Sequence, residues 1–229
     1  MVTIFMNQKL MKILIIPDVH GRSFWIEPCS HIDEFDKVIF LGDYHDPYSF
    51  EVSQDTSRHR LRDELVPFVT EHKDKVVCLF GNHDGNYLVG DMADRVDYWH
   101  KTEIRDYMKQ MNIKLVHKEG NYLFSHSGVL PKWLESNDLT LDDLNNLPFD
   151  HQALMNVSPY RGGWSEAGSC VWGDVREYAA SEHIPGLYQI FGHTQLAENA
   201  VIMEDWADLD CRKAFTLIDG EIKPYEEKV

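Results

Sequence analysis

Side chains that bind metal ions or transfer protons recur in this chain of 229 residues, each time directly after a short apolar stretch. The pattern occurs in five segments: IIPDVHG (15–21), FLGDYHD (40–46), LFGNHD (79–84), LFSHSG (123–128) and IFGHT (190–194). The candidate ligands in these segments are carboxylates, imidazoles and one amide, belonging to Asp18, His20, Asp43, Asn82, His126 and His193. Nitrogen and oxygen donors without a thiolate suit divalent ions such as Mn²⁺, Fe²⁺, Zn²⁺ or Mg²⁺. The set is large enough for two ions if one carboxylate bridges them.

Buried strands are the elements that must position these side chains, because a strand covered on both faces reads as a continuous run of Val, Ile, Leu and Phe. In the first part of the chain, such runs alternate with helical spacing: strands are predicted near 12–17, 37–41 and 75–80, and helices near 22–31 and 53–72. This alternation predicts βαβ units with parallel strands. Ligands bind beyond the carboxyl ends of such strands, so we expect the five segments to meet at one crevice.

The second half of the chain predicts more β structure. Glycine turns predict hairpins at Gly120 and at Asp219-Gly220. The remaining predicted elements are a helix over 96–111, strands near 113–117, 121–125, 187–191, 199–203 and 213–218, and helices near 131–136, 140–147 and 150–156. An α/β start and a β-rich end fit two mixed sheets packed face to face with helices outside. At this length we expect residues 1–229 to form a single domain.

Three local signals refine this prediction. Ser53 is a suitable N-cap for the helix near 53–72, and Pro67 predicts a break or kink in its later turns. The segment 158–169 is rich in Gly and Ser, and we expect it to be a mobile loop near the site. Residues 1–11 are expected to be either a dispensable leader or an edge strand.

The charge balance argues against one class of partner. The chain has 22 Lys and Arg against 38 Asp and Glu, a net charge of −16. This field repels polyanions, so binding to extended nucleic acid is disfavoured. Part of the acidity is expected to be ligand charge that awaits cations.

The spacing of the cysteines and the hydropathy of the chain indicate the cellular compartment. The four cysteines, Cys29, Cys78, Cys170 and Cys211, form no CxxC pair and lie far apart, which is typical of reduced intracellular thiols. The continuous apolar run at 13–16 is too short for a signal peptide or a membrane span. We therefore expect a cytoplasmic protein with no membrane association.

Taken one at a time, the motifs are weak. An Asp-x-His such as Asp18-Val19-His20 occurs by chance in many proteins, and a lone His behind a buried strand is more often a core residue than a ligand. Asn82 is more informative, because Asn is a poor residue for a strand end unless its carbonyl is needed. The coincidence of all five segments is what favours a shared site.

In their order, the motifs resemble those of the calcineurin-like metallophosphoesterases. The matching residues span most of the chain and are Asp18-x-His20, Gly42-Asp43-x-x-Asp46, Gly81-Asn82-His83-Asp84, His126 and Gly192-His193. Within that superfamily the chain looks most similar to the branch of the serine/threonine protein phosphatases and symmetrical diadenosine tetraphosphatase. The segments that carry this finer resemblance are Gly42–Asp46, Ser125–Gly128 and Val171–Asp174.

This resemblance implies a four-layer α/β/β/α sandwich with two divalent metal ions, Mn, Fe or Zn. It assigns Asp18 and His20 to one ion, Asp43 to a bridging position, and Asn82, His126 and His193 to the other ion. A hydroxide held between the ions would then attack the phosphorus of a phosphate ester.

Two further residues follow from this assignment. Since adjacent residues on a turn point differently, His83 is better placed as the general acid for the leaving oxygen than as a ligand. Asp46 would orient His83 and favour its protonated form. The structural alternative for His83 is that it only caps the following helix.

Two departures from the family pattern affect the substrate. Asp46 is followed by Pro47-Tyr48, where the matching branch continues with Arg-Gly, whose Arg grips phosphate. Arg161 or the Arg58–Arg60 cluster could replace this cation, and Arg22 is a further candidate for phosphate binding. Gln195 stands where the phosphodiesterase branches place a last His, so it is at most a weak ligand or a neighbour of the first ion.

Three functions remain in competition. The leading one is a phosphomonoesterase that acts on a phosphoprotein, a nucleotide or a small phosphate ester. The second is a phosphodiesterase or nuclease of the same superfamily. The third is a metal-free scaffold that binds another protein, although clustered carboxylates without cations would be costly. The sequence identifies no protein partner.

Overall fold

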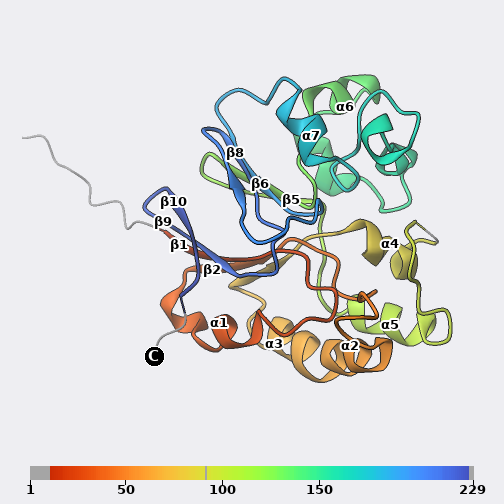
Figure 1. Ribbon diagram of the computed structural model, residues 1–229, viewed down its shortest axis with the longest axis vertical. Coiled ribbons are helices and arrows are strands. Elements are labelled where there is room, and N and C mark those ends of the chain that lie inside the picture. Colours follow the sequence, from red (N-terminus) through yellow and green to blue (C-terminus); the bar gives the residue numbers. More distant parts are fainter. Residues whose placement is uncertain (1–10, 91, 227–229) are drawn as a thin grey trace, which may run out of the picture.

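The computed structural model describes residues 11–90 and 92–226. Within these residues the strands form two five-stranded sheets, each of them mixed, that lie one over the other with helices on both outer faces (Figure 1). This is the predicted four-layer α/β/β/α sandwich. Residues 1–10 fall outside the described part, and so does the prediction of a leader or edge strand.

The first sheet has the order β10-β9-β1-β2-β3. Its strands are β1 (Lys12–Ile16), β2 (Lys37–Phe40), β3 (Val76–Cys78), β9 (Phe215–Ile218) and β10 (Glu221–Pro224). As predicted, β1, β2 and β3 are parallel. β9 and β10 form the predicted hairpin, whose turn residues Asp219 and Gly220 have φ angles of 57° and 81°. Two positive φ values in succession suit a tight hairpin turn between twisted strands.

The second sheet has the order β4-β5-β6-β8-β7. Its strands are β4 (Val116–Glu119), β5 (Tyr122–Ser125), β6 (Tyr188–Phe191), β7 (Val201–Ile202) and β8 (Trp206–Asp208). The β4–β5 hairpin turns at Gly120, as predicted. The pattern did not predict β8, because three residues are too few to show alternation. This strand pairs in parallel with β6 and antiparallel with the edge strand β7.

Alternate residues of the central strands enter two different cores. Ile13 and Ile15 of β1 pack between the sheets with Phe124 and Ile190 of the second sheet. Leu14, the residue between them, packs on the helix side. Both faces of the strand are therefore apolar, which explains the continuous hydrophobic run in the sequence.

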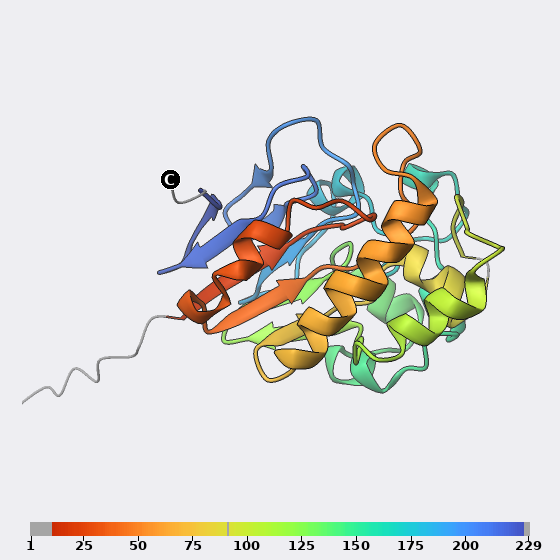
Figure 2. The same ribbon diagram turned by 90° about the horizontal axis from the view of Figure 1, so that it is seen from below.

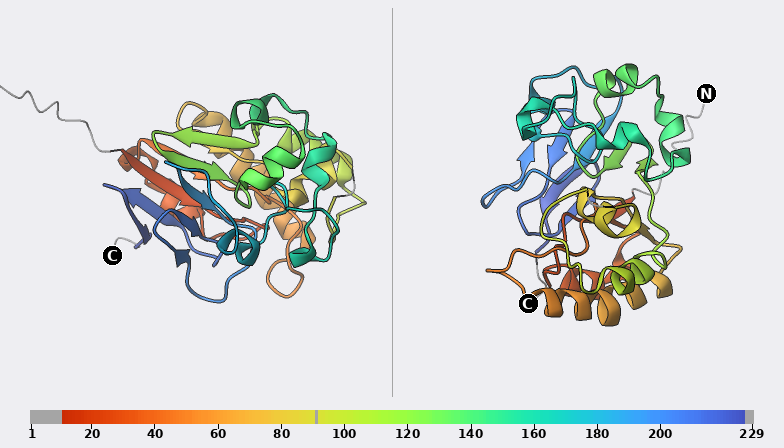
Figure 3. Two further views of the ribbon diagram at one scale, coloured as in Figure 1. Left: turned by 90° about the horizontal axis from the view of Figure 1, so that it is seen from above. Right: turned by 90° about the vertical axis from the view of Figure 1, so that its right-hand side faces the viewer.

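Helices cover the outer face of each sheet. Four helices cover the first sheet: α1 (Ile26–Ser30), α2 (Gln54–Arg60), α3 (Val66–Glu71) and α5 (Lys101–Met108). Seen from below, α1 and the α2–α3 helix lie in front of its strands (Figure 2). The second sheet is covered by α6 (Pro131–Ser136), α7 (Val175–Ala179) and short 3₁₀ turns, and the side view separates the two halves (Figure 3). No helix in the described ranges is both long and apolar enough to cross a bilayer.

The helix predicted over 53–72 is interrupted in the expected region. Ser53 caps it, since its Oγ accepts from the backbone N–H of Thr56 at 3.0 Å. A π-helical turn, Leu61–Leu65, separates α2 from α3 just before Pro67. Proline removes a backbone donor, and a wider turn accommodates that loss.

Several predicted helices are shorter than their apolar spacing indicated. α1 starts at Ile26 instead of residue 22, because Arg22 is held at the site by Glu51. α5 starts at Lys101 instead of residue 96, since the backbone N–H of Asp97 bonds to the hydroxyl of Tyr87. The segments predicted near 140–147 and 150–156 are 3₁₀ turns, Leu141–Asn146 and Gln152–Met155.

Candidate active site

Five strand ends deliver the predicted ligands to one place. Asp18 and His20 follow β1, Asp43 follows β2, and Asn82 begins α4 (Asn82–Leu88) after β3. From the second sheet, His126 follows β5 and His193 follows β6. The structure brings the six side chains together, and all are buried.

Asp43 lies at the centre of this arrangement. It belongs to two groups whose ligand atoms lie within 4.8 Å of one another: Asp18, Asp43, His126 and His193 in one, and His20, Asp43 and His83 in the other. Asp43 Oδ2 lies 3.4 Å from His20 Nε2 and 3.6 Å from His126 Nε2. A carboxylate between two groups of donors is placed to bridge two cations.

Backbone carbonyls fix the histidine rings. His20 Nδ1 lies 3.0 Å from the carbonyl of His45, and His126 Nδ1 lies 2.8 Å from the carbonyl of Leu41. A carbonyl can only accept, so each Nδ1 carries the proton and each Nε2 carries a lone pair. His126 Nε2 then faces another acceptor, Asn82 Oδ1, at 3.0 Å. Two acceptors that face each other suit an intervening cation, so the donor set fits a metal ion.

The electrostatics of the site favour metal binding at neutral pH. Burial lowers the pKa of His20 to about 3 and that of His193 well below its usual value, so both rings are neutral and their lone pairs are available. Burial opposes ionisation of Asp43, but the neighbouring histidines, His126 first, lower its pKa to about 2. Burial, with Asp43 nearby, raises the pKa of Asp18 to about 6.

Two glycines, each directly before a candidate ligand, leave room for the carboxylate of a ligand from a different strand. A Cβ on Gly81 would lie 2.2 Å from Asp43 Oδ1, and one on Gly192 would lie 2.4 Å from Asp18 Oδ1. The ligand turns thus interlock across strands. Three of the ligand residues have left-handed backbones, with φ of 44° at His20, 53° at Asp43 and 70° at His193. Such strain in non-glycine residues is concentrated at functional sites.

A second set of contacts holds His83 beside the ligands. Its Nδ1 lies 3.1 Å from Asp46 Oδ2, and its backbone N–H donates to Asp43 Oδ1 at 2.9 Å. Asp46 also accepts from Asn86 Nδ2 at 2.7 Å and from the hydroxyl of Tyr87. Burial disfavours the charged ring, but Asp43 and Asp46 outweigh it and raise the pKa of His83. This environment is that of a proton donor.

The ligand groups open into a pocket of about 210 Å³. It is lined by His20, Asp43, Tyr48, Asn82, His83, Ala93, Asp94, Arg95, Arg161, Trp172 and His193. The side chains of candidate ligands and of the candidate acid are therefore accessible from one hollow.

Comparison of the sequence with models of known protein families identifies the family. Residues 11–196 match the family model described as calcineurin-like phosphoesterase. The chain belongs to the calcineurin-like phosphoesterases. The buried Asp and His groups are where a member of this family could bind divalent ions.

One curated relative belongs to the predicted branch. A symmetrical bis(5'-nucleosyl)-tetraphosphatase of Nitrosospira multiformis is 30% identical over 80 residues, which span 30% of this chain and 28% of that protein. The match thus covers under a third of the relative's length.

Solved structures support the fold. A cold-active protein-tyrosine phosphatase of a Shewanella species superposes with a TM-score of 0.58 at 16% identity, covering 95% of this chain and 81% of that one. A serine/threonine phosphatase of Saccharomyces cerevisiae with similarity to human phosphatase PP5 gives 0.54 at 13% identity, covering 96% and 81%.

Of the two candidate phosphate-binding arginines, one lines the pocket and the other does not. Arg161 lines the phosphoesterase pocket, and its Nη2 donates to the carbonyl of His193 and to Thr194 Oγ1, each at 3.1 Å. Arg22 does not line the pocket. Its Nε donates to Glu51 at 2.6 Å and its Nη1 to the carbonyl of Asp18 at 3.1 Å, so it supports the Asp18 turn from behind.

The other candidates also lie away from the pocket. Gln195 is exposed, because the chain turns outward after the left-handed His193. Arg58 pairs with Glu103 at 3.3 Å, and Arg60 donates to the carbonyl of Gly21. The structure therefore brings neither Gln195 nor the Arg58–Arg60 cluster to the candidate ligands.

The loop predicted at 158–169 does reach the site through Arg161. Its two ends are tied to one carboxylate: Ser158 Oγ donates to Glu177 Oε2 at 2.7 Å, and the Gly168 N–H donates to Glu177 Oε1 at 3.0 Å. Glu177 on α7 thus sets where Arg161 enters the pocket.

Sequence reasoning missed two residues of the phosphoesterase site. Asp84 accepts from the N–H groups of Asp43, Tyr44 and Gly81 at 2.8–2.9 Å and so clamps two ligand turns together. Its place in the Gly-Asn-His-Asp motif was the available signal. Arg95 lines the pocket from the segment before α5, where no motif marks it.

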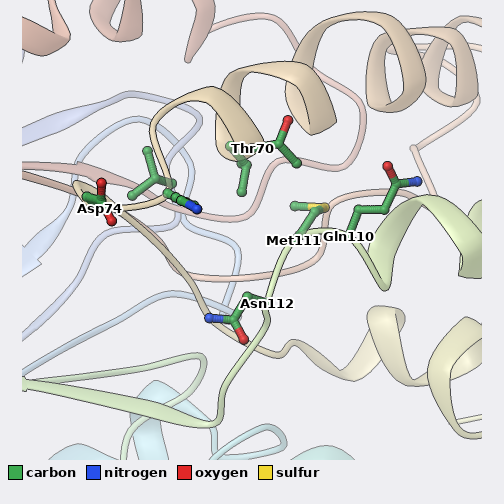
Figure 4. Close-up of a pocket in the computed structure, with 8 residues that line it drawn as sticks. Thr70, Asp74, Gln110, Met111 and Asn112 are labelled. Atoms are coloured by element: carbon green, nitrogen blue, oxygen red, sulfur yellow. The ribbon is translucent and has the colours of Figure 1, made fainter.

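A separate hollow of about 540 Å³ lies between the end of α3 and the residues that follow α5 (Figure 4). Thr70, Asp74, Gln110, Met111 and Asn112 line it. None of the candidate ligands does, so this hollow is not part of the phosphoesterase site.

Proposed function

We propose that the protein hydrolyses phosphate monoesters with a pair of divalent ions, Mn, Fe or Zn. Asp18 and His20 would hold one ion, Asn82, His126 and His193 the other, and Asp43 both. The observation that carries this proposal is the membership of Asp43 in both groups of ligand atoms. When bound, such a pair lowers the pKa of water toward neutrality and neutralises charge on the phosphoryl group.

The protein's own residues supply the proton and the orientation. In this proposal His83 donates to the leaving oxygen, because its Nδ1 is held by Asp46 and its Nε2 lies beside Arg95 and Asp94, which line the pocket. Arg161, anchored by His193 and Thr194, binds a phosphoryl oxygen of the substrate.

The volume of the pocket and the net charge of the chain both bear on which phosphate esters can be substrates. At about 210 Å³ it suits the phosphoryl end of a small ester, a nucleotide or a phosphoprotein side chain. The similarity to a bis(5'-nucleosyl)-tetraphosphatase keeps nucleotides among the candidates. Phosphodiesters are the alternative substrate. Extended nucleic acid is disfavoured by the net charge of −16.

We propose a cytoplasmic location on the evidence of the thiols. Cys29, Cys78, Cys170 and Cys211 are all buried and free. Burial raises the pKa of the Cys78 thiol to about 12, which keeps it protonated and unreactive. Such cysteines suit a reducing compartment.

The direct test is hydrolysis of p-nitrophenyl phosphate by the purified protein with Mn²⁺. We expect turnover that is lost on chelation and restored by Mn²⁺. Asp43→Asn should lower turnover by orders of magnitude, while the matched control Asp63→Asn, at an exposed aspartate paired with Arg62, should leave it unchanged. Hydrolysis that survives complete removal of metal would refute the proposal. Faster turnover of bis-p-nitrophenyl phosphate than of the monoester would favour the diesterase alternative.

A further inference from the structure

The pocket contains a second guanidinium group that the proposed function has not used. Among the described residues that line it, Arg95 and Arg161 are the only Lys or Arg side chains. Arg161 is anchored through its Nη2 to His193 and Thr194 and is the phosphate-binding residue of the proposed function. Arg95 comes from the segment between α4 and α5, on the His83 side of the pocket.

Three contacts hold the Arg95 guanidinium where it is, and one of them is an ion pair between its Nη1 and Asp94 Oδ1 at 3.6 Å. Its Cζ lies 3.8 Å from the centre of the Tyr48 ring, a cation–π distance. Its Nε donates to the carbonyl of Asp46 at 3.2 Å. Arg95 also has a left-handed backbone with φ of 60°, which is uncommon outside glycine. Pro47-Tyr48, which follows Asp46 in the sequence, thus supplies the ring on which a cation from another segment rests.

A further contact brings the Arg95 guanidinium next to His83. Its Nη2 lies 3.0 Å from His83 Nε2, the ring nitrogen that Asp46 does not hold. A phosphoryl group whose leaving oxygen approaches His83 therefore comes within reach of Arg95. His83 Nε2 can accept this bond only while it carries no proton, whereas a phosphoryl oxygen is charged and accepts at any protonation state of the ring. Exchange of one acceptor for the other is therefore favourable.

We propose that Arg95, supported by Tyr48, binds the phosphoryl oxygens of the substrate and makes the site selective for dianionic phosphate monoesters over diesters. This inference rests on the proposed function of the same pocket. Its physical basis is charge: the ester must enter among Asp18, Asp43 and Asp94, and the chain carries a net charge of −16. A monoester dianion gains about twice as much Coulomb energy from a fixed cation as a diester monoanion does.

The test compares two substrates in the Mn²⁺-loaded enzyme. Arg95→Gln should lower kcat/KM for p-nitrophenyl phosphate about 10- to 100-fold, the usual cost of a lost charged hydrogen bond, and lower that for bis-p-nitrophenyl phosphate only a few-fold. Arg95→Lys should recover part of the monoester rate, since it restores charge without the planar fork. Arg58→Gln, outside the pocket, is the control and should match the wild type.

The role of Tyr48 is tested by a matched pair. Tyr48→Phe keeps the ring and should keep the selectivity, whereas Tyr48→Leu removes it and should raise KM for the monoester. If Arg95 only supports the Asp46 backbone, Arg95→Gln would slow both substrates equally, and the proposal would be wrong.

A binding measurement separates this proposal from the proposed function. Calorimetry with inorganic phosphate needs no turnover, and we expect binding to the Mn²⁺-loaded Arg95→Gln protein to be about 10-fold weaker than to the wild type. Equal affinities would overturn the role of Arg95 even in an active enzyme. Absence of hydrolysis by a wild type that binds phosphate through Arg95 would instead count against the proposed function alone.

Discussion

At the scale of the residue, the structure separates two kinds of histidine. His20 and His193 are kept neutral by burial, with pKa values below the usual range, as metal ligands must be. His83 has a raised pKa because Asp43 and Asp46 outweigh its burial. In the proposed function, the same residue type would thus supply ligands at two positions and a proton at a third.

We expect His83→Asn to lower kcat by about 10²- to 10⁴-fold, the usual contribution of a general acid. A general acid must hold its proton, so the wild-type rate should fall as the pH rises through the raised pKa of His83. The variant should lack this alkaline limb, and a pH profile of kcat/KM measures it. His59→Asn, at an exposed position on α2, is the control. An alkaline limb that persists unchanged in His83→Asn would contradict the acid role.

The sequence was sufficient to predict which side chains meet but not every contact between them. Asp18, Asp43 and His193 could be predicted because each follows a buried strand, and strand ends converge in this type of sheet. Arg95 could not, because its position depends on the Tyr48 ring and on the Asp46 carbonyl. Gln195 was considered only because related branches place a last His there, and it is exposed after the left-handed turn at His193.

At the scale of the element, the turns that follow the strands interlock. Gly81 has an extended backbone with φ of −99°, which any residue can adopt. A glycine is therefore needed here because of space and not because of backbone conformation: a Cβ at this position would collide with the Asp43 carboxylate. The loop after β2 and the start of α4 cannot be positioned independently of each other.

Gly81→Ala should weaken Mn²⁺ binding by about 10- to 100-fold, the range seen when groups that orient ligands are altered. The added Cβ would lie 2.2 Å from Asp43 Oδ1 and must displace that carboxylate. Gly90→Ala is the matched control, because a Cβ there has no neighbour within 4 Å. Metal titrations of both variants measure the difference. Equal affinity in Gly81→Ala and Gly90→Ala would show that Asp43 tolerates displacement or does not bind metal.

The elements were predictable where both faces of a strand are buried and less so elsewhere. β1, β2 and β3 stand within a residue or two of their predicted ranges, because continuous apolar runs specify them. α5 begins five residues late, since the stretch before it is held by Tyr87 and Arg95 at the site. Local spacing cannot reveal such tertiary contacts.

At the scale of the whole molecule, the site joins the two sheets. The first sheet contributes Asp18, His20, Asp43 and Asn82, and the second contributes His126 and His193. Cations shared by these residues would tie the sheets together at one edge. Metal binding should therefore be linked to the stability of the fold.

Mn²⁺ at about 100-fold above its Kd should stabilise the protein by about 2.7 kcal/mol, which raises the thermal midpoint of a chain of this size by about 5–10 °C. Asp43→Asn should abolish most of this rise, whereas Asp63→Asn should retain it. Thermal unfolding with and without chelator measures the effect. Identical midpoints in both conditions would mean that the folded state does not bind the ion.

The most direct test of the account is the anomalous scattering of a crystal grown or soaked with Mn²⁺. We predict two manganese peaks about 3.5–4 Å apart, the separation of two-metal hydrolytic sites. Asp43 should lie between them, His20 on one side and His126 on the other. A single peak away from Asp43, or none at this edge of the sheets, would contradict the dinuclear site.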